Sequence, residues 1–176
     1  MRAVNAVTTS WPGLHVDRPS FSAVAEAELD AVYRYLLFLT GNRAVAEDLT
    51  GETFEKAFRA WRRFDPRRGT PRTWLCRIAR STALDHFRSE DRRRRREDRY
   101  ARGAQTVVDG ELGPSPLEFA LAQLSAAERE VVALRVLLEL DGPAAARVLG
   151  ISATACSTRL SRALKRLEEL MTDDGE

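Results

Sequence analysis

The residues of this sequence that could do chemistry are mainly arginines, and they are concentrated in three places. Nine arginines and two aspartates lie within residues 59–88, and four basic residues without any acid lie within residues 153–167. A third group, residues 92–96, is an unbroken run of arginine. Guanidinium groups donate well to phosphate oxygens and to the edges of bases. The formal net charge is only +2, so the placement of charge, rather than its sum, predicts two anion-facing surfaces.

The arginine run lies in the stretch FRSEDRRRRREDRY, between the acidic pairs Glu90-Asp91 and Glu97-Asp98. A block of like charge is most often a solvated segment. The run also follows a basic helical pattern directly, which favours contact with the phosphates of a nucleic acid. Pairs spaced by four residues, such as Asp91 with Arg95, would compete with that contact. The sequence leaves both interpretations open.

Enzymatic chemistry has little support in the residues. Asp85 and His86 are adjacent, so on a helix they do not face each other. Gly69 stands alone rather than in a phosphate-binding glycine loop. The two histidines, His15 and His86, do not neighbour a cysteine at metal-ligand spacing. We therefore expect no catalytic residues, no metal and no cofactor.

The composition is globular, with 44% apolar residues in a chain of 176, enough for one domain or two small ones. Cys76 and Cys156 lie far apart in helical patterns, which favours two reduced structural thiols over a disulfide. Residues 1–20, with Pro12, Gly13 and Pro19, are predicted to be a flexible leader. They also lack the long apolar core of a signal peptide. No apolar run reaches membrane-spanning length. We expect a cytoplasmic protein.

Residues 21–100 are predicted to form a first helical domain. Apolar residues recur every three or four positions over 21–39 and again over 45–64, separated by the stop signal Gly41-Asn42. The second pattern is acidic in its first half and basic in its second half. The sequence DPRRG at 65–69 must end it.

A third helical pattern begins at Thr70, whose hydroxyl can cap the helix, with Pro71 in the first position, where the missing N–H costs nothing. Its apolar stripe leaves several arginines near or on the other faces. Trp74, near the start, either belongs to the core or stacks on unpaired bases. Beyond this domain, residues 101–116 contain the glycine and proline cluster of a flexible linker.

A second helical domain is predicted over residues 117–172. The capping box Ser125 to Glu128 begins a helix, and a short helix, a turn at Gly150 and a long basic helix follow. This order is typical of a helix-turn-helix, although many helical hairpins with a glycine turn bind nothing. The last helix presents short donors and guanidinium forks that suit a major groove. They are Ser157, Thr158, Arg159, Ser161, Arg162 and Arg166. With no convincing strand, the predicted fold is all-α, with two small domains joined by a flexible linker.

Two segments resemble the two domains of an extracytoplasmic-function (group 4) sigma factor of bacterial RNA polymerase. They read AEDLTGETFEKAFRAWRRFDPRRGTPRTWLCRIARSTALDHFR and LSAAEREVVALRVLLELDGPAAARVLGISATACSTRLSRALKRL. The resemblance covers about residues 31–87 and 124–170. It implies a non-enzymatic initiation factor that gives core polymerase promoter recognition and strand opening. The implied partners are core RNA polymerase and promoter DNA, and an anti-sigma factor is left open.

The resemblance also implies three sets of contact residues. The helix around 46–61 is implied to dock on polymerase through Asp48, Leu49, Glu52, Phe54 and Trp61. The loop and helix over 67–88 are implied to open and hold the minus-ten element through Arg67, Arg68, Arg72, Trp74, Arg77, Arg80, Ser81 and Arg88. The last helix, with the six residues named above, is implied to read the minus-thirty-five element.

Departures from the family pattern affect which promoter sequence would be recognised, and they leave the class of protein unchanged. Gly51 stands where a glutamine is usual, Pro71 where an aromatic is usual, and Ser81 where an asparagine is usual. A rival interpretation is a helix-turn-helix repressor that acts as a dimer without polymerase. Such a repressor has no need of the acidic and then aromatic helix over 47–61. An RNA-binding adaptor is a third interpretation, but the sequence lacks a stacking sheet or glycine clamp.

Overall fold

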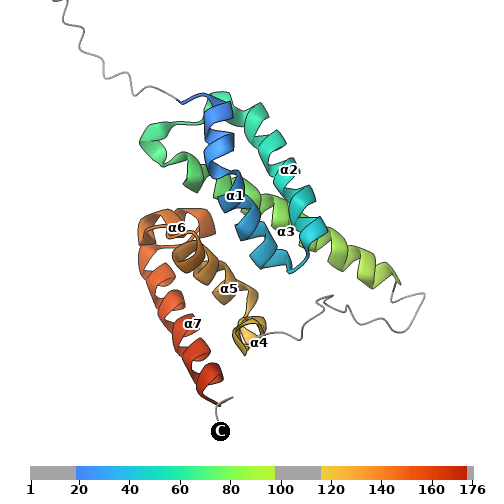
Figure 1. Ribbon diagram of the computed structural model, residues 1–176, viewed down its shortest axis with the longest axis vertical. Helices are drawn as coiled ribbons and strands as arrows, with labels where there is room; N and C mark the ends of the chain where they lie inside the picture. The colour runs from blue at the N-terminus through green and yellow to red at the C-terminus, as the bar shows by residue number, and fades with distance from the viewer. Residues whose placement is uncertain (1–18, 98–115, 174–176) are drawn as a thin grey trace, which may run out of the picture.

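The computed structural model describes residues 19–97 and 116–173, and over these residues the chain is helical, with no strand (Figure 1). The long elements are α1 (Phe21–Thr40), α2 (Arg43–Ala60), α3 (Pro71–Glu97), α4 (Pro116–Gln123), α5 (Ala126–Val132), α6 (Gly142–Leu149) and α7 (Ala153–Asp173). Two 3-10 turns, η1 (Trp61–Arg63) and η2 (Pro66–Arg68), precede α3, and a π-helical turn, η3 (Ala133–Leu137), follows α5. The predicted all-α fold is confirmed. Almost all of the predicted leader and linker lies outside the described residues.

Local capping signals fix where the first three helices begin. Ser20 and Asn42 cap α1 and α2, each accepting a hydrogen bond from a backbone N–H three residues further on. Gly41 separates the two helices with a φ of 61°, a left-handed conformation that costs glycine no Cβ clash. Thr70 caps α3 by accepting from the N–H of Thr73 at 3.2 Å. The stop at Gly41-Asn42 and the cap at Thr70 were predicted from the sequence, but the caps at Ser20 and Asn42 were not.

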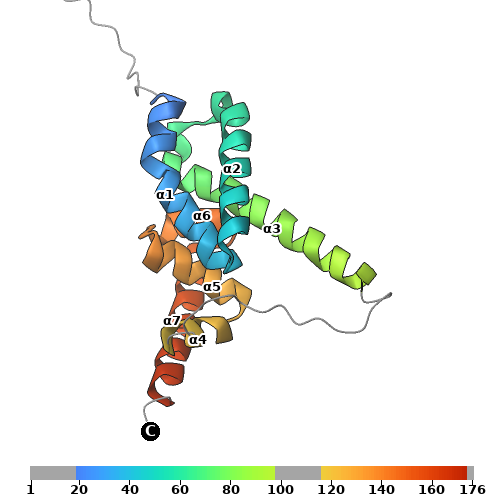
Figure 2. The ribbon, with the colours of Figure 1, turned by 45° about the vertical axis from the view of Figure 1, so that its right-hand side comes forward.

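The first half of the chain is a bundle of α1, α2 and α3 (Figure 2). Each of the three helices packs against the other two. Its fully buried side chains come from all three elements and include Val32, Tyr35, Leu36, Ala57, Leu75 and Ala79. Because the apolar stripe of α3 faces inward, several of its arginines remain on the outer faces.

The second half is the predicted helix-turn-helix. Ser125 and Glu128 form a reciprocal capping box at the start of α5. Asp141 caps α6, and Gly150, with a φ of 70°, turns the chain from α6 into α7. Both α5 and α6 pack against α7. The helix predicted from Ser125 onward keeps its α-helical form only to Val132, where η3 follows.

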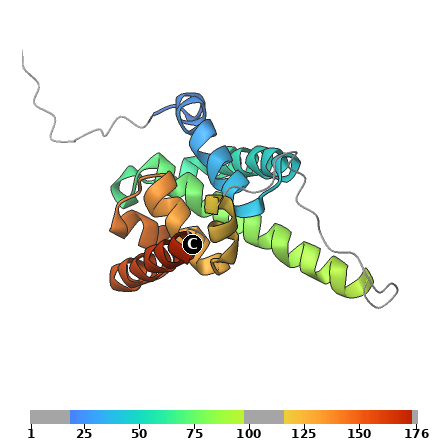
Figure 3. The same ribbon diagram turned by 60° about the horizontal axis from the view of Figure 1, so that its bottom comes forward.

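The two halves share one hydrophobic core. α3 packs against α6, and α1 packs against η3, so that the orange α6 lies beside the green α3 in Figure 3. Buried residues from both halves form one contiguous cluster. The sequence predicted two tethered units and did not predict this packing. Periodicity shows which face of a helix is buried but not which element covers it.

The end of α3 projects away from the rest of the molecule (Figures 1 and 2). The arginine run, Arg92–Arg96, continues α3 as a helix, whereas a block of like charge is most often a poorly ordered, solvated segment. Arg93 pairs with Glu90 at 3.3 Å, and Arg95 pairs with Asp91 at 3.0 Å. The predicted Asp91–Arg95 pair is thereby confirmed. Such pairs stabilise an exposed helix.

Burial of Cys76 predicts a dependence of stability on pH. Cys76 and Cys156 are free and buried, and burial raises the pKa of the Cys76 thiol to about 12, from about 8.5 in an unfolded chain. The stability that comes from the neutral thiol is therefore complete below about pH 8.5 and is lost as the pH rises toward about 12. Between about pH 8 and about pH 10.5, the wild type should lose about 2 kcal/mol more of its free energy of unfolding than Cys76→Ala, measured with urea. Equal losses would mean that the folded chain ionises the thiol normally.

Candidate nucleic-acid and partner interfaces

The exposed face of α7 carries the donors that the sequence predicted. Ser152 caps this helix by accepting from the N–H of Ala155 at 3.1 Å. A groove of about 560 Å³ lies between the start of α5 and the start of α7, and both Arg159 and Arg162 line it. Arg159 is half-buried, and the other five predicted side chains are exposed: Ser157, Thr158, Ser161, Arg162 and Arg166. The face can donate hydrogen bonds to a polyanion along its length.

Glu128 lies in the same groove, and sequence reasoning did not place it there. Hydrogen bonds from Ser125 lower the pKa of its carboxyl group, and the charges of Arg166 and Arg159 act in the same direction. The capping-box pattern identified Glu128 only as a helix cap. Packing of α5 against α7 brings its carboxylate beside the basic face, where it limits how closely a phosphate can approach.

A second basic face lies on α3 and on the turn before it. The exposed members of the predicted set are Arg67, Arg68, Arg77, Ser81 and Arg88. Arg68 and Arg77 line a cleft of about 90 Å³ together with Arg63 and with Arg147 of α6. Among the described residues, these four arginines have no ion-pair partner. Arg147 was not predicted, because only the packing of the two halves brings it here.

Arg72 has a structural partner. Its Nε donates to Oε2 of Glu28 at 2.7 Å, which joins α3 to α1. The Glu28 side chain is largely buried, and the Arg72 side chain is partly exposed. Arg72 therefore braces the bundle rather than standing free on the basic face.

Arg80 is held by a carboxylate in this arrangement, and its expected role in binding nucleic acid stays a prediction. Its Nε and Nη2 donate to the two carboxylate oxygens of Glu130 at 3.0 and 3.1 Å, a bidentate pair. The Arg80 and Glu130 side chains are only 26% and 11% exposed. Tyr35 of α1 is buried nearby, and burial followed by the Glu130 charge raises its pKa. The pair joins α3 to α5 and therefore links the two halves of the chain.

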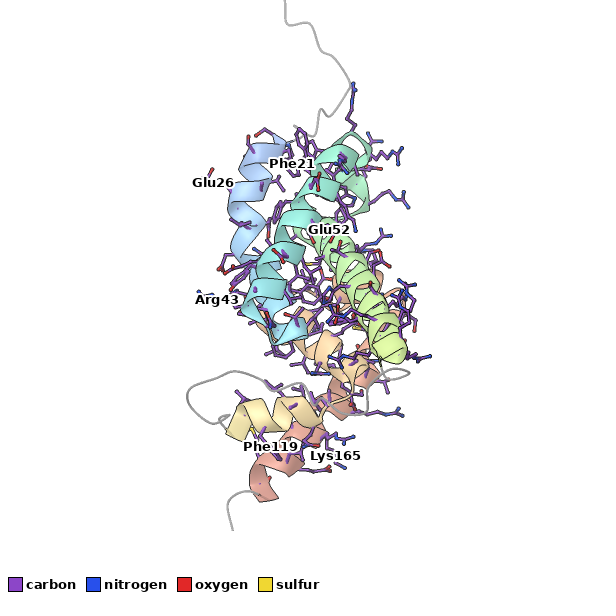
Figure 4. All side chains as sticks on the ribbon, turned by 90° about the vertical axis from the view of Figure 1, so that its right-hand side faces the viewer. Phe21, Glu26, Arg43, Glu52, Phe119 and Lys165 are labelled. Carbon is purple, nitrogen blue, oxygen red and sulfur yellow. The ribbon has the colours of Figure 1, made fainter. Side chains whose placement is uncertain are left out.

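Trp74 belongs to an aromatic cluster. Its ring centroid lies 5.6 Å from that of Trp61 and 5.5 Å from that of Phe64, and these two rings stack at 4.8 Å. Phe21, labelled at the start of α1 in Figure 4, contacts both Trp61 and Phe54. Of the two interpretations left open for Trp74, the structure therefore supports packing within the fold.

The face of α2 that was predicted to dock on a partner is only partly exposed. Asp48 and Glu52 are exposed, and Glu52, labelled in Figure 4, pairs with Lys56 at 2.7 Å. Leu49 is 4% exposed and belongs to the hydrophobic core. Its side chain lies on the inner stripe of the helix, so this arrangement does not support its role as a contact residue, which stays a prediction.

Two exposed apolar side chains near this face were missed. Phe58 on α2 is 66% exposed, and Leu29 on α1 is 52% exposed. Both α1 and α2 line a groove of about 470 Å³ that includes Leu29, Phe54 and Gly51. No heavy atom lies within 4 Å of the position of a Cβ at Gly51, so packing does not require glycine there. The apolar period assigned Phe58 to the core, and no sequence signal distinguished it.

The described part of the chain contains neither a candidate membrane-spanning helix nor a candidate metal site. None of its helices is long and apolar enough to cross a membrane. It also contains no group of three or more histidine, cysteine or carboxylate side chains placed to hold a metal ion.

Both halves match models of known protein families. Residues 24–93 match Sigma-70 region 2, and residues 116–167 match Sigma-70, region 4. The chain is 34% identical to the ECF RNA polymerase sigma factor BldN of Streptomyces coelicolor, over 88% of this chain and 61% of that protein. It is 32% identical to the ECF RNA polymerase sigma factor SigC of Mycobacterium tuberculosis, over 82% of this chain and 79% of that protein. The chain thus spans less than two thirds of the BldN length.

Two solved structures also have folds similar to that of this chain. The sigma factor RpoE of Bartonella quintana, in complex with the anti-sigma factor NepR, is 27% identical, with a TM-score of 0.67 over 86% of this chain and 96% of that chain. CnrH, in complex with the cytosolic domain of CnrY, is 26% identical, with a TM-score of 0.65 over 88% of each chain.

The Arg80–Glu130 pair should be energetically coupled. Removing one partner leaves the other charge largely buried without compensation, so Arg80→Gln and Glu130→Gln should each lower the free energy of unfolding by about 2 kcal/mol. A double-mutant cycle in urea should give a coupling energy of about 1 to 2 kcal/mol. The exposed pair Arg88–Asp85 is the matched control and should couple by about 0.5 kcal/mol or less. Additive losses at Arg80 and Glu130 would show that the pair does not hold the halves together.

Proposed function

The chain belongs to the extracytoplasmic-function family of RNA polymerase sigma factors, and we propose that it binds core RNA polymerase and directs promoter recognition, promoter opening and transcription initiation. In this proposal the polymerase carries out the chemistry, and the chain itself is not an enzyme. The observation that carries the proposal is the presence of two separate cationic faces, on α3 and on α7, one in each segment that matches a family model.

In this proposal α7 reads the minus-thirty-five element. A major groove about 12 Å wide admits a helix, and the exposed side of α7 offers hydroxyls at Ser157 and Thr158 and a guanidinium at Arg162. Contacts to base edges choose the sequence, whereas contacts from Arg166 to phosphates fix the register. Glu128, held by its capping box, excludes phosphate from one end of the same groove.

The minus-ten element is assigned to α3 and the turn before it. Arg68 and Arg77 are exposed and can contact the backbone of the opened strand. Trp74 supports this turn from within the aromatic cluster. Arg80 joins the DNA-binding face only by leaving Glu130. Promoter binding through Arg80 and packing of the two halves through Glu130 therefore exclude each other.

The partner face for polymerase is assigned to α2 with the adjoining part of α1. Asp48, Glu52, Phe54 and Trp61 remain candidates, and the exposed Phe58 extends the set. Exposed apolar side chains rimmed by charge are typical of protein interfaces. Because polymerase and promoter DNA are cytoplasmic, we assign the chain to the cytoplasm.

An anti-sigma factor is a further partner in this proposal. The RpoE structure of Bartonella quintana contains one, and its fold covers most of this chain. The packing of α3 against α6 and the Arg80–Glu130 pair already hold the two halves of this chain together. A partner that bound the packed arrangement would stabilise it by mass action and would keep Arg80 away from DNA.

Charge reversal on α2 tests the proposal against a polymerase-independent repressor. Asp48→Arg with Glu52→Arg changes two exposed side chains, so the fold should survive, while co-elution with core polymerase should weaken by about tenfold or more through like-charge and steric misfit. Glu168→Arg with Glu169→Arg on α7 is the matched control and should co-elute normally. Normal co-elution of the α2 variant would favour the repressor. In parallel, transcripts made from a promoter library by polymerase with the wild-type chain should share two upstream elements.

Replacement of Arg162 tests whether α7 recognises the upstream promoter element. Arg162→Ala should reduce use of promoters by about 1 to 3 kcal/mol and should change the preference at one position of the upstream element, if the side chain contacts a base. Arg34→Ala, an exposed arginine on α1, is the control and should change neither. A reduction that is uniform across promoters would assign Arg162 to phosphate, and no reduction would count against α7 as the reader.

A further inference from the structure

The projecting end of α3, residues 88–97, is a surface that the proposed function leaves almost unused. The side chains of residues 88 and 92–96 are all exposed. This arm contains no apolar residue, and it extends away from the other helices (Figures 1 and 3). A helix that is polar on all sides persists through pairs along its own surface or through an outside partner. The arm has arginines that form ion pairs along its own surface and arginines that are open to an outside partner.

The ion pairs of the arm divide its arginines into two sets. Arg93 and Arg95 pair with Glu90 and Asp91, which stabilises the helix and neutralises two of its positive charges. Arg92, Arg94 and Arg96 have no carboxylate partner among the described residues and form the second set. The Nε of Arg96 instead donates to the backbone carbonyl of Arg92 at 3.2 Å, which holds its guanidinium against the helix.

Two members of the second set, Arg92 and Arg96, lie in one row with Arg88. Arg88, Arg92 and Arg96 follow one another at intervals of four residues, so they share a face of the helix. Arg88 makes only an exposed contact with Asp85, at 3.4 Å. Eight residues of helix rise about 12 Å, and one strand of B-DNA has a phosphate for about every 3.4 Å of axis. The row therefore spans about three to four phosphate intervals of one strand, and each of its three charges can meet a phosphate within that length.

We propose that Arg88, Arg92 and Arg96 bind the phosphates of duplex promoter DNA beside the element that α3 opens. The proposal rests on the proposed function, because it uses the placement of α3 on the promoter. Since the arm is a rigid continuation of α3, binding of that helix brings the row to the adjoining DNA. A protein partner fits less well, because protein interfaces have an apolar centre and the arm has no apolar side chain.

The test compares two variants with equal loss of charge on the same arm. Arg92→Gln with Arg96→Gln removes two members of the row, whereas Arg93→Gln with Arg95→Gln removes the two paired arginines. Polymerase with each chain is titrated onto one promoter that the wild type selects from the library, over the same range of salt. The row variant should flatten the slope of log affinity against log salt by about 1.8, which is about 0.9 for each phosphate that the chain no longer neutralises. The control variant should change the slope by less than half as much.

Promoter choice should stay the same in both variants, because phosphate contacts carry no sequence information. An unchanged slope in the row variant, or equal flattening in the two variants, would overturn the proposal. Weaker co-elution of the row variant with polymerase, measured without DNA, would also overturn it by assigning the arm to the protein. Failure of the wild type itself to bind polymerase or promoter would instead refute the proposed function, so the two failures are distinguishable.

Discussion

The orientation of α3 about its own axis, which decides which side chains face each neighbour, is the constraint on which the rest of the structure depends. One face of this helix places Leu75 and Ala79 in the core of the first bundle, and another meets α6 and Glu130. The remaining face is basic and exposed. These three faces share the circumference, so with about 3.6 residues per turn each face has little more than one residue per turn. The Thr70 cap fixes where the helix starts and thereby which side chains reach each face.

Ion pairing separates arginines that hold the fold from arginines that are available to an anion. Arg72 and Arg80 are bound to Glu28 and Glu130, which lie 44 and 50 residues away in the chain. Arg77, on the same helix, has no such partner among the described residues. The sequence assigned all three to DNA because local spacing contains no information on a carboxylate so distant. In contrast, Asp91 with Arg95 was predictable, because both lie on one helix.

The same distinction explains which parts of the fold could be predicted. Helix ends follow from local chemistry at Ser125, Gly41 and Gly150, and the sequence therefore predicted them closely. The packing of α3 on α6 depends on surfaces far apart in sequence, and it was missed. For Leu49, two signals in the sequence disagreed. Its position in the apolar period indicated burial, but the family resemblance implied contact with a partner. In the structure the Leu49 side chain is buried, as the period indicated.

The packed arrangement and the DNA-bound arrangement should respond differently to salt. The Arg80–Glu130 pair is largely shielded from water, so dissolved ions screen it weakly. Contacts between exposed arginines and DNA phosphates release counterions and weaken steeply as salt rises. Added salt therefore shifts the balance toward the packed chain, in which Arg80 is occupied. A single carboxylate on α5 can compete with a polyanion because it is already in place, whereas DNA must first separate the two halves and expose their shared core.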